Sequence, residues 1–247
     1  MKRNWNLNWL RLGVMVLSLM GFALRSAVYA VGVDEKNLII AGHPLKIALW
    51  LVTALSVGLV LFAVRKGETS GYYEVYFRPS LMAGVGQILC AAGIALTVLL
   101  NVPLLPGLVG QLWRIAGILS ASLLLWAAFS RVMGKKPFFL CHMVVSIFFA
   151  LHLVVHYQLW CSNPQLQDYV FAFLGTIGLM FCGYFHAAFE AGRGNPRAVL
   201  AVGLITGYLC VVSLANTEYL YLYLGGALWA YTSLCSRRLK AGEPDDC

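Results

Sequence analysis

The chain has 247 residues, of which 60% are hydrophobic and only 11% are charged, and its formal net charge is +8. Soluble domains carry about 25% charged residues, and a soluble fold of this size could not bury so much apolar surface. The basic residues occur in short clusters between apolar runs and form no continuous basic face. This pattern excludes nucleic acid as a partner and indicates a protein embedded in the lipid bilayer.

Eight segments are apolar over about 20 residues, the length that a helix needs to cross the hydrocarbon core. In chain order they are 12–31, 46–64, 79–100, 108–129, 137–160, 169–189, 198–215 and 219–235. The predicted fold class is therefore all-α: a polytopic integral membrane protein with a bundle of eight transmembrane helices. One transmembrane domain covers residues 1–240, and a short acidic tail follows at 241–247.

The Lys and Arg residues predict the orientation of these helices. Only three residues separate the last two segments, so a seven-span topology that merges or drops one of them is the alternative. With eight spans, fourteen of the 18 basic residues share one side: Lys2, Arg3, Arg11, Arg65, Lys66, Arg78, Arg131, Lys135, Lys136, Arg193, Arg197, Arg237, Arg238 and Lys240. Such an excess marks the cytoplasmic side, so both termini are predicted to be cytoplasmic and the protein to be multi-pass in the plasma membrane. A seven-span topology would place Arg237, Arg238 and Lys240 outside, against the rule that basic residues are concentrated on the cytoplasmic side.

A cleaved signal peptide is an alternative to the first span. The chain begins with basic residues and an apolar run, and Val28-Tyr29-Ala30 resembles a small-residue cleavage site. Arg25 would interrupt the boundary of such a signal, which favours an uncleaved first helix. Cleavage would leave seven spans and the same topology elsewhere.

Short matches between spans suggest an internal duplication. Residues 22–28 and 149–155 share Phe-Ala-Leu at the start and Val at the end, and 125–130 and 228–233 share Leu-Trp-Ala and a final Ser. These matches pair the first span with the fifth and the fourth with the eighth. They predict a parallel 4+4 repeat, related by an axis along the membrane normal, as in some transporters.

Cationic or titratable residues lie at a similar depth in several spans. Counted at 1.5 Å per residue, Arg25, Arg114 and His152 lie about 10, 9 and 12 Å from the outer ends of their helices. His156 is one turn above His152, and Lys46 marks the outer edge of the second span. An Arg within a span costs several kcal/mol unless it is paired or hydrated, so these positions are functional candidates.

These five residues predict a substrate-binding site for a small anion in the outer-leaflet half. The two arginines would hold a phosphate or carboxylate through bidentate hydrogen bonds, and His152 would donate a hydrogen bond or carry a proton. The structural alternative is that Arg25, Arg114 and Lys46 reach the headgroups, or that the arginines pair with acidic residues at the outer rim.

The spacing of His152 and His156 places both on one helix face, which would permit a shared metal. Positions 153–155 hold no acidic residue, and no Cys-x-x-Cys pair occurs, so no metal site is predicted and no cofactor can be assigned. Haem ligation by these histidines lacks a second histidine at matching depth on another span.

His186 and Glu190 form a second pair with this spacing, at the cytoplasmic end of the sixth span. They are candidates for a gate or proton relay, and the alternative is an interfacial pair solvated by headgroups. His142 is predicted to be a hydrogen-bonded packing residue, and Gln87 to form a hydrogen bond between helices.

The function predicted from these features is a small-solute transporter or permease, for an anion. The partners predicted are the lipid bilayer and a small anionic ligand or lipid, with an oligomer or a partner subunit left open. One alternative is an integral-membrane enzyme that acts on a lipid or headgroup, with the histidines as acid and base. Because no serine or carboxylate stands beside them in a catalytic spacing, no catalytic residue is assigned. A sensor or an accessory subunit of a membrane complex is the third reading.

Overall fold

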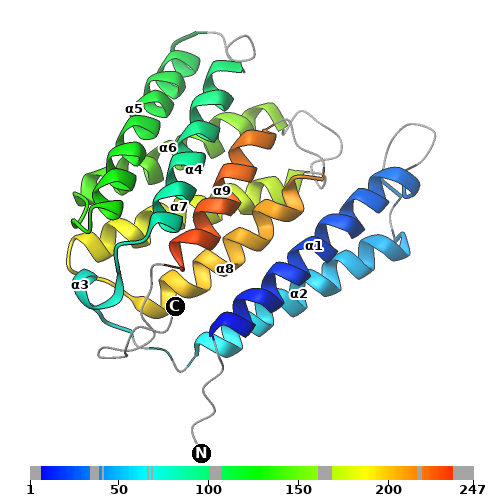
Figure 1. The fold of residues 1–247 in the computed structure, drawn as a ribbon. Coiled ribbons are helices and arrows are strands. Elements are labelled where there is room, and N and C mark those ends of the chain that lie inside the picture. Colours follow the sequence, from blue (N-terminus) through cyan, green and yellow to red (C-terminus); the bar gives the residue numbers. More distant parts are fainter. Residues whose placement is uncertain are drawn as a thin grey trace, which may run out of the picture.

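The structure, a computed structural model, describes residues 7–33, 39–40, 42–65, 67, 69–100, 107–160, 169–215 and 219–235. The helices in these ranges are α1 (Leu7–Val31), α2 (Pro44–Val64), α3 (Tyr73–Tyr76), α4 (Leu81–Leu100), α5 (Gly107–Val132), α6 (Phe139–Trp160), α7 (Val170–Glu190), α8 (Pro196–Ser213) and α9 (Leu220–Ser233). Figure 1 shows the long helices packed side by side in one bundle.

Seven of these helices are long and apolar enough to cross a membrane: α1, α2, α4, α5, α6, α7 and α8. This is the architecture of a multi-pass membrane protein. The segment predicted as the eighth span, 219–235, forms α9, which has 14 residues. At 1.5 Å per residue α9 is about 21 Å long, shorter than a hydrocarbon core of about 30 Å. The count of eight crossings therefore stays a prediction.

Local sequence explains where several helices begin and end. α8 starts with Pro196, and the side chain of Asn195 accepts a hydrogen bond of 3.1 Å from the Ala198 amide. Proline suits the first helical position because it has no N–H group to leave without a partner there. Past the end of α7, Gly192 has φ of +79°, a backbone conformation that favours glycine. These residues form a tight turn between the two helices.

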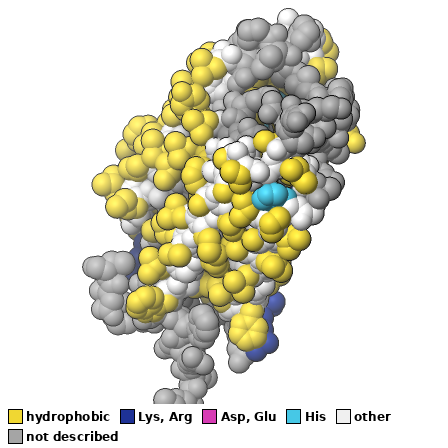
Figure 2. Space-filling model, turned by 90° about the vertical axis from the view of Figure 1, so that its right-hand side faces the viewer, with side chains coloured by type: hydrophobic (Ala, Val, Ile, Leu, Met, Phe, Trp, Pro, Cys, Tyr) yellow, Lys and Arg dark blue, Asp and Glu magenta, His cyan; other side chains and the backbone are white. Residues whose placement is uncertain are grey.

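The helices divide into a core of six, α4 to α9, and a hairpin formed by α1 and α2. Within the core, the closest neighbours are α4 with α9, α4 with α5, and α6 with α7, whereas the hairpin packs on α8. Figure 2 shows an extensive apolar surface with basic side chains at its lower edge. Leu19 and Leu51 of the hairpin are each 65% exposed, as expected for side chains that face lipid.

The α4–α9 seam is close because both helices carry glycine where they touch. A Cβ added to Gly225 of α9 would lie 2.7 Å from the Leu89 carbonyl oxygen of α4. A Cβ added to Gly93 of α4 would collide with the backbone carbonyl of Tyr221 in α9. Small residues on both helices thus let the two backbones approach closely along one seam.

The first turns of α1 and the end of α9 lie at the same end of the bundle. There, the Arg11 guanidinium donates a hydrogen bond to the Leu234 carbonyl. At this end the segment before α3 also pairs with the α7–α8 turn, through a bridge between Gly71 and Gly194. We call it the basic end because the described residues there include Arg11, Arg65, Arg78, Arg131, Lys135, Lys136, Arg193 and Arg197.

One helix pair has no counterpart under the predicted duplication. A 4+4 repeat would make α4 equivalent to α8 and α9 equivalent to α5. The closest pair in the bundle is α4 with α9, yet α8 and α5 are not among the substantial neighbours. The repeat stays a prediction from sequence.

Candidate functional site

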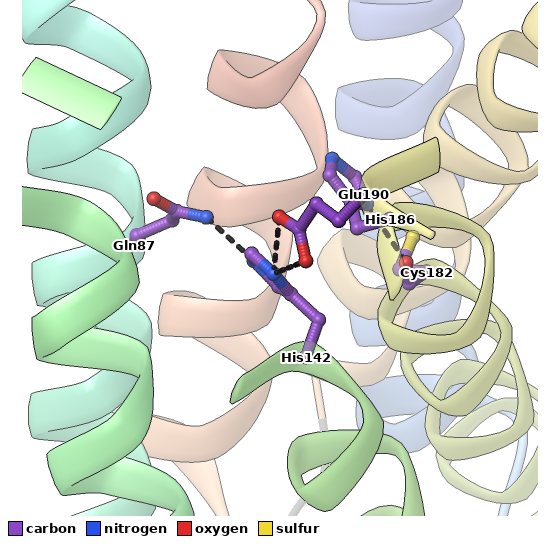
Figure 3. Close-up of polar contacts among 5 residues, drawn as sticks. All are labelled: Gln87, His142, Cys182, His186 and Glu190. Carbon is purple, nitrogen blue, oxygen red and sulfur yellow. Dashed lines mark hydrogen bonds and ion pairs between the residues drawn. The ribbon is translucent and has the colours of Figure 1, made fainter. Parts of the chain in front are cut away.

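A buried polar network joins three core helices near the basic end. Nδ1 of His142 in α6 lies 2.8 and 2.9 Å from the two carboxylate oxygens of Glu190 in α7. Its other ring nitrogen, Nε2, lies 2.9 Å from Nε2 of Gln87 in α4. Figure 3 shows the imidazole between the amide and the carboxylate. Gln87 and His142 are fully buried and Glu190 is 4% exposed, so the network is shielded from both water and lipid.

Aromatic rings and a second histidine surround this network. The His186 ring stacks on His142 with centroids 5.3 Å apart, and Nδ1 of His186 donates to the Cys182 carbonyl at 2.8 Å. The indole of Trp229, from α9, lies 6.0 Å from the His142 ring and almost parallel to it. Four helices of the core therefore supply the walls and polar groups of one site.

A buried arginine lies on the α3 side of the network. Arg131, in the last turn of α5, is 1% exposed and stands over the ring of Phe77 at 5.1 Å. Its charge acts on both His142 and Glu190. It also acts on Tyr73 of α3, whose pKa is raised by burial although Arg131 lowers it.

The position of Glu190 contradicts the alternative in which it is an interfacial residue solvated by headgroups. Its surroundings include Tyr73, Tyr76 and Phe77, which are buried. The short helix α3 folds its aromatic rings onto Phe189, next to Glu190, with the Phe77 and Phe189 centroids 5.1 Å apart. Because this cover removes solvent, Glu190 takes its hydrogen bond from His142, 48 residues away in sequence.

A second candidate site lies at the opposite end, between the hairpin and α7. Arg25, Tyr29, Lys46, Trp50 and Phe171 line a pocket of about 80 Å³, together with Val28, Ile39, Leu49 and Val170. We call it the cationic pocket. Arg25 is 2% exposed; its guanidinium donates to the Val212 carbonyl at 3.1 Å and lies 5.2 Å from the Phe171 ring centroid.

The predicted histidine pair lies elsewhere, among core aromatic rings. The rings of His152 and His156 lie one turn apart on α6, with centroids 3.8 Å apart and planes tilted by 31°, and both are fully buried. The Trp113 indole donates to Nδ1 of His152 at 3.2 Å, and Tyr219 stands edge-on to both histidines. Nδ1 of His156 donates to the His152 carbonyl at 2.8 Å.

The five residues predicted to form one outer site are thus distributed over the molecule. Arg25 and Lys46 share the cationic pocket, and His152 and His156 share the aromatic enclosure of α5, α6 and the start of α9. Arg114, the neighbour of Trp113 on α5, is half-buried and does not line the cationic pocket. These residues were predicted to lie at one depth in the membrane, but their helices contact different neighbours, so the side chains do not meet in one site.

Within the described ranges, no group of three or more His, Cys, Asp or Glu side chains is arranged to hold a metal ion. No protein family matches the sequence, and neither a curated protein nor a solved structure shows significant similarity to it.

Proposed function

We propose that this multi-pass membrane protein transports or binds a small anion, and that the cationic pocket is where the anion enters. The observation that carries the proposal is the convergence of Arg25 and Lys46 on one small pocket at the end of the bundle opposite the basic end. An arginine this deeply placed in an apolar helix is a functional candidate by default.

The pocket suits a small anionic group in size and chemistry. Its volume of about 80 Å³ exceeds the roughly 10 to 15 Å³ that a cavity needs to hold one water molecule. A carboxylate, a halide or one phosphate group is of this scale. Tyr29 and Trp50 add a hydroxyl and an indole to the two cations, and Phe171 supplies an apolar wall.

The orientation follows from the charge distribution. Basic residues mark the cytoplasmic side, so the basic end would face the cytoplasm and the cationic pocket the outside of the plasma membrane. The hydrogen bond between Arg11 and Leu234 joins the start of α1 to the end of α9. It supports the prediction that both termini lie on the same side of the membrane, which an even number of crossings requires.

Anion binding can be tested on the purified protein in detergent. We would measure the thermal midpoint with chloride, acetate and inorganic phosphate, because a ligand that binds only the folded state raises it. At least one of the three should stabilise the wild type, and Arg25→Gln and Lys46→Gln should each weaken its apparent affinity at least tenfold. Arg114→Gln is the matched control, because Arg114 lies outside the pocket, and it should bind as the wild type does.

Stabilisation by none of these anions, or an equal loss in Arg114→Gln, would contradict the proposal. Native mass spectrometry separates two sources of the anion: a retained anionic lipid, absent from Arg25→Gln, indicates a headgroup, whereas a free anion leaves no lipid adduct. Uptake of the stabilising anion into vesicles then distinguishes transport from binding alone.

The enzyme alternative has less support from the geometry. Both histidines that would act as acid and base are fully buried and enclosed by Trp113, Phe148 and Tyr219. A lipid headgroup would have to displace these rings before it reached either imidazole.

A further inference from the structure

We propose that Gln87, His142 and Glu190 form a binding site for one exchangeable proton, held within the core near the basic end. The inference is independent of anion binding, because it rests on the polar network and on no residue of the cationic pocket. Three polar side chains from three helices meet there, all buried, and each of the two ring nitrogens of His142 has one partner.

Counting hydrogens defines the first state of the site. With Glu190 ionised, both carboxylate oxygens can only accept, so Nδ1 of His142 must carry the hydrogen that they share. Gln87 presents its amide nitrogen to Nε2, and because that amide N–H can only donate, Nε2 must be the acceptor. The arrangement therefore describes a neutral imidazole beside a carboxylate.

The same three residues can hold one more proton without losing a hydrogen bond. Protonation of Nε2 makes it a donor, and a half-turn of the Gln87 amide then presents Oε1 as the acceptor. In the described structure Oε1 of Gln87 is buried without a hydrogen-bond partner, so the turn breaks no bond there. A glutamine is suited to this position because its two ends exchange donor for acceptor, which an asparagine-sized or apolar side chain could not do at this reach.

The surrounding groups limit the site to a single proton. Arg131 of α5 and Lys136, just before α6, are the positive charges that act on Glu190. The other titratable neighbours are Tyr73 of α3, Cys141 of α6, and Cys182 and His186 of α7. Gln87 and Trp229, from α4 and α9, are uncharged. Because His186 stacks on His142 at 5.3 Å, a second proton on its ring would face an adjacent like charge.

The electrostatic neighbours predict opposite effects of two substitutions. Glu190→Gln removes the negative charge that stabilises an imidazolium, so proton binding at His142 should weaken at least tenfold and its midpoint should move to lower pH. Arg131→Gln removes a positive charge that opposes the added proton, so the midpoint should move to higher pH. A residue with only a packing role in the core would not give shifts of opposite sign.

The experiment is nitrogen NMR of the detergent-purified full chain labelled on its five histidines. The His142 signals are identified by their loss in His142→Gln. In the wild type, Nε2 should change from acceptor to N–H on acidification while circular dichroism shows intact helices. His43→Gln is the matched control, because His43 caps α2 far along the chain from the network, and it should leave the His142 midpoint unchanged.

Two outcomes would overturn the proposal. One is a His142 ring that keeps the same protonation over the whole pH range in which the wild type stays folded, a result that needs no variant. The other is a midpoint that does not move in Glu190→Gln and Arg131→Gln, or moves in the same direction in both.

Discussion

The α1–α2 hairpin and the six-helix core differ in how much of each helix faces protein. In both hairpin helices 28% of the most apolar stretch is buried, whereas the values for α4 and α8 are 56% and 61%. The core contains close helix contacts at glycine residues and a buried polar network that is shielded from water and lipid. The hairpin is attached mainly to α8, and the cationic pocket lies where it meets the core.

This difference separates two requirements of a membrane protein. A ligand must reach its site, so a pocket belongs at the boundary of a lightly packed element. A buried carboxylate and imidazole are stable only where every partner is fixed, so they belong in the interior. The two candidate sites follow this division, and the following substitutions test it from the largest expected effect to the smallest.

Gly93→Ala should destabilise the core strongly. The added Cβ would collide with the Tyr221 backbone carbonyl, so α4 and α9 would have to move apart. Overpacking of this kind costs about 1 to 3 kcal/mol, and a neighbouring backbone cannot rotate away as a side chain can. We expect a loss of at least about 2 kcal/mol in the free energy of unfolding, measured in mixed detergent micelles.

Gly58→Ala in the hairpin is the matched control. Nothing lies within 4 Å of a Cβ added at Gly58. The change should therefore be neutral or stabilise α2 by up to about 1 kcal/mol, the difference in helix propensity. Equal losses at Gly58 and Gly93 would show that the hairpin is packed as tightly as the core.

Tyr208→Phe should loosen the hairpin without unfolding the core. The Tyr208 hydroxyl lies 2.9 Å from Oγ1 of Thr53 in α2, so the substitution removes a hydrogen bond between hairpin and core. Such bonds within membranes are worth about 0.6 kcal/mol on average. Amide hydrogen exchange should become faster in α1 and α2 and stay unchanged in α4 and α9.

Tyr223→Phe provides the contrast. Its hydroxyl bonds to Thr176 and to the Ala172 carbonyl, both at 3.0 Å and both in α7. Loss of these hydrogen bonds should accelerate amide hydrogen exchange in α7 and α9 and leave exchange in the hairpin unchanged. If both variants affect the same helices, the division into hairpin and core is wrong.

The helix positions could be predicted because the length of each apolar segment can be read directly from the sequence. The expected span 46–64 is α2 (Pro44–Val64), and 108–129 lies within α5 (Gly107–Val132). The four-residue α3 was not predicted. Tyr73–Tyr76 is too short to show the periodic pattern of apolar residues that identifies a helix, and its burial depends on Phe189 and Val199 of other helices.

The sites were predicted only in part, for a related reason. Counting along a helix gives the depth of a side chain, but not which helix it faces. Arg25 and Arg114 match in depth and lie on helices with different neighbours, whereas His142 and Glu190 meet across α6 and α7. The contact between His142 and Glu190 could have been predicted from depth. Gln87 and His142 lie within about 9 Å of the ends of their helices at the basic end, and Glu190 is the last residue of α7 at that same end.

The smallest effect is expected for the exposed ion pair of α3, the connection between hairpin and core. Lys136 and Glu74 form an ion pair of 4.0 Å, but these side chains are 40% and 70% exposed. Exposed pairs contribute about 0 to 1 kcal/mol, so Glu74→Gln should change the thermal midpoint little, and added salt should make the small difference smaller still. Phe77 stacks on Tyr73 at 5.0 Å and packs edge-on against Phe189, so Phe77→Ala should detach α3 and expose Glu190 to solvent. If Glu74→Gln were as damaging as Phe77→Ala, charge and not aromatic burial would hold the cover of the polar network in place.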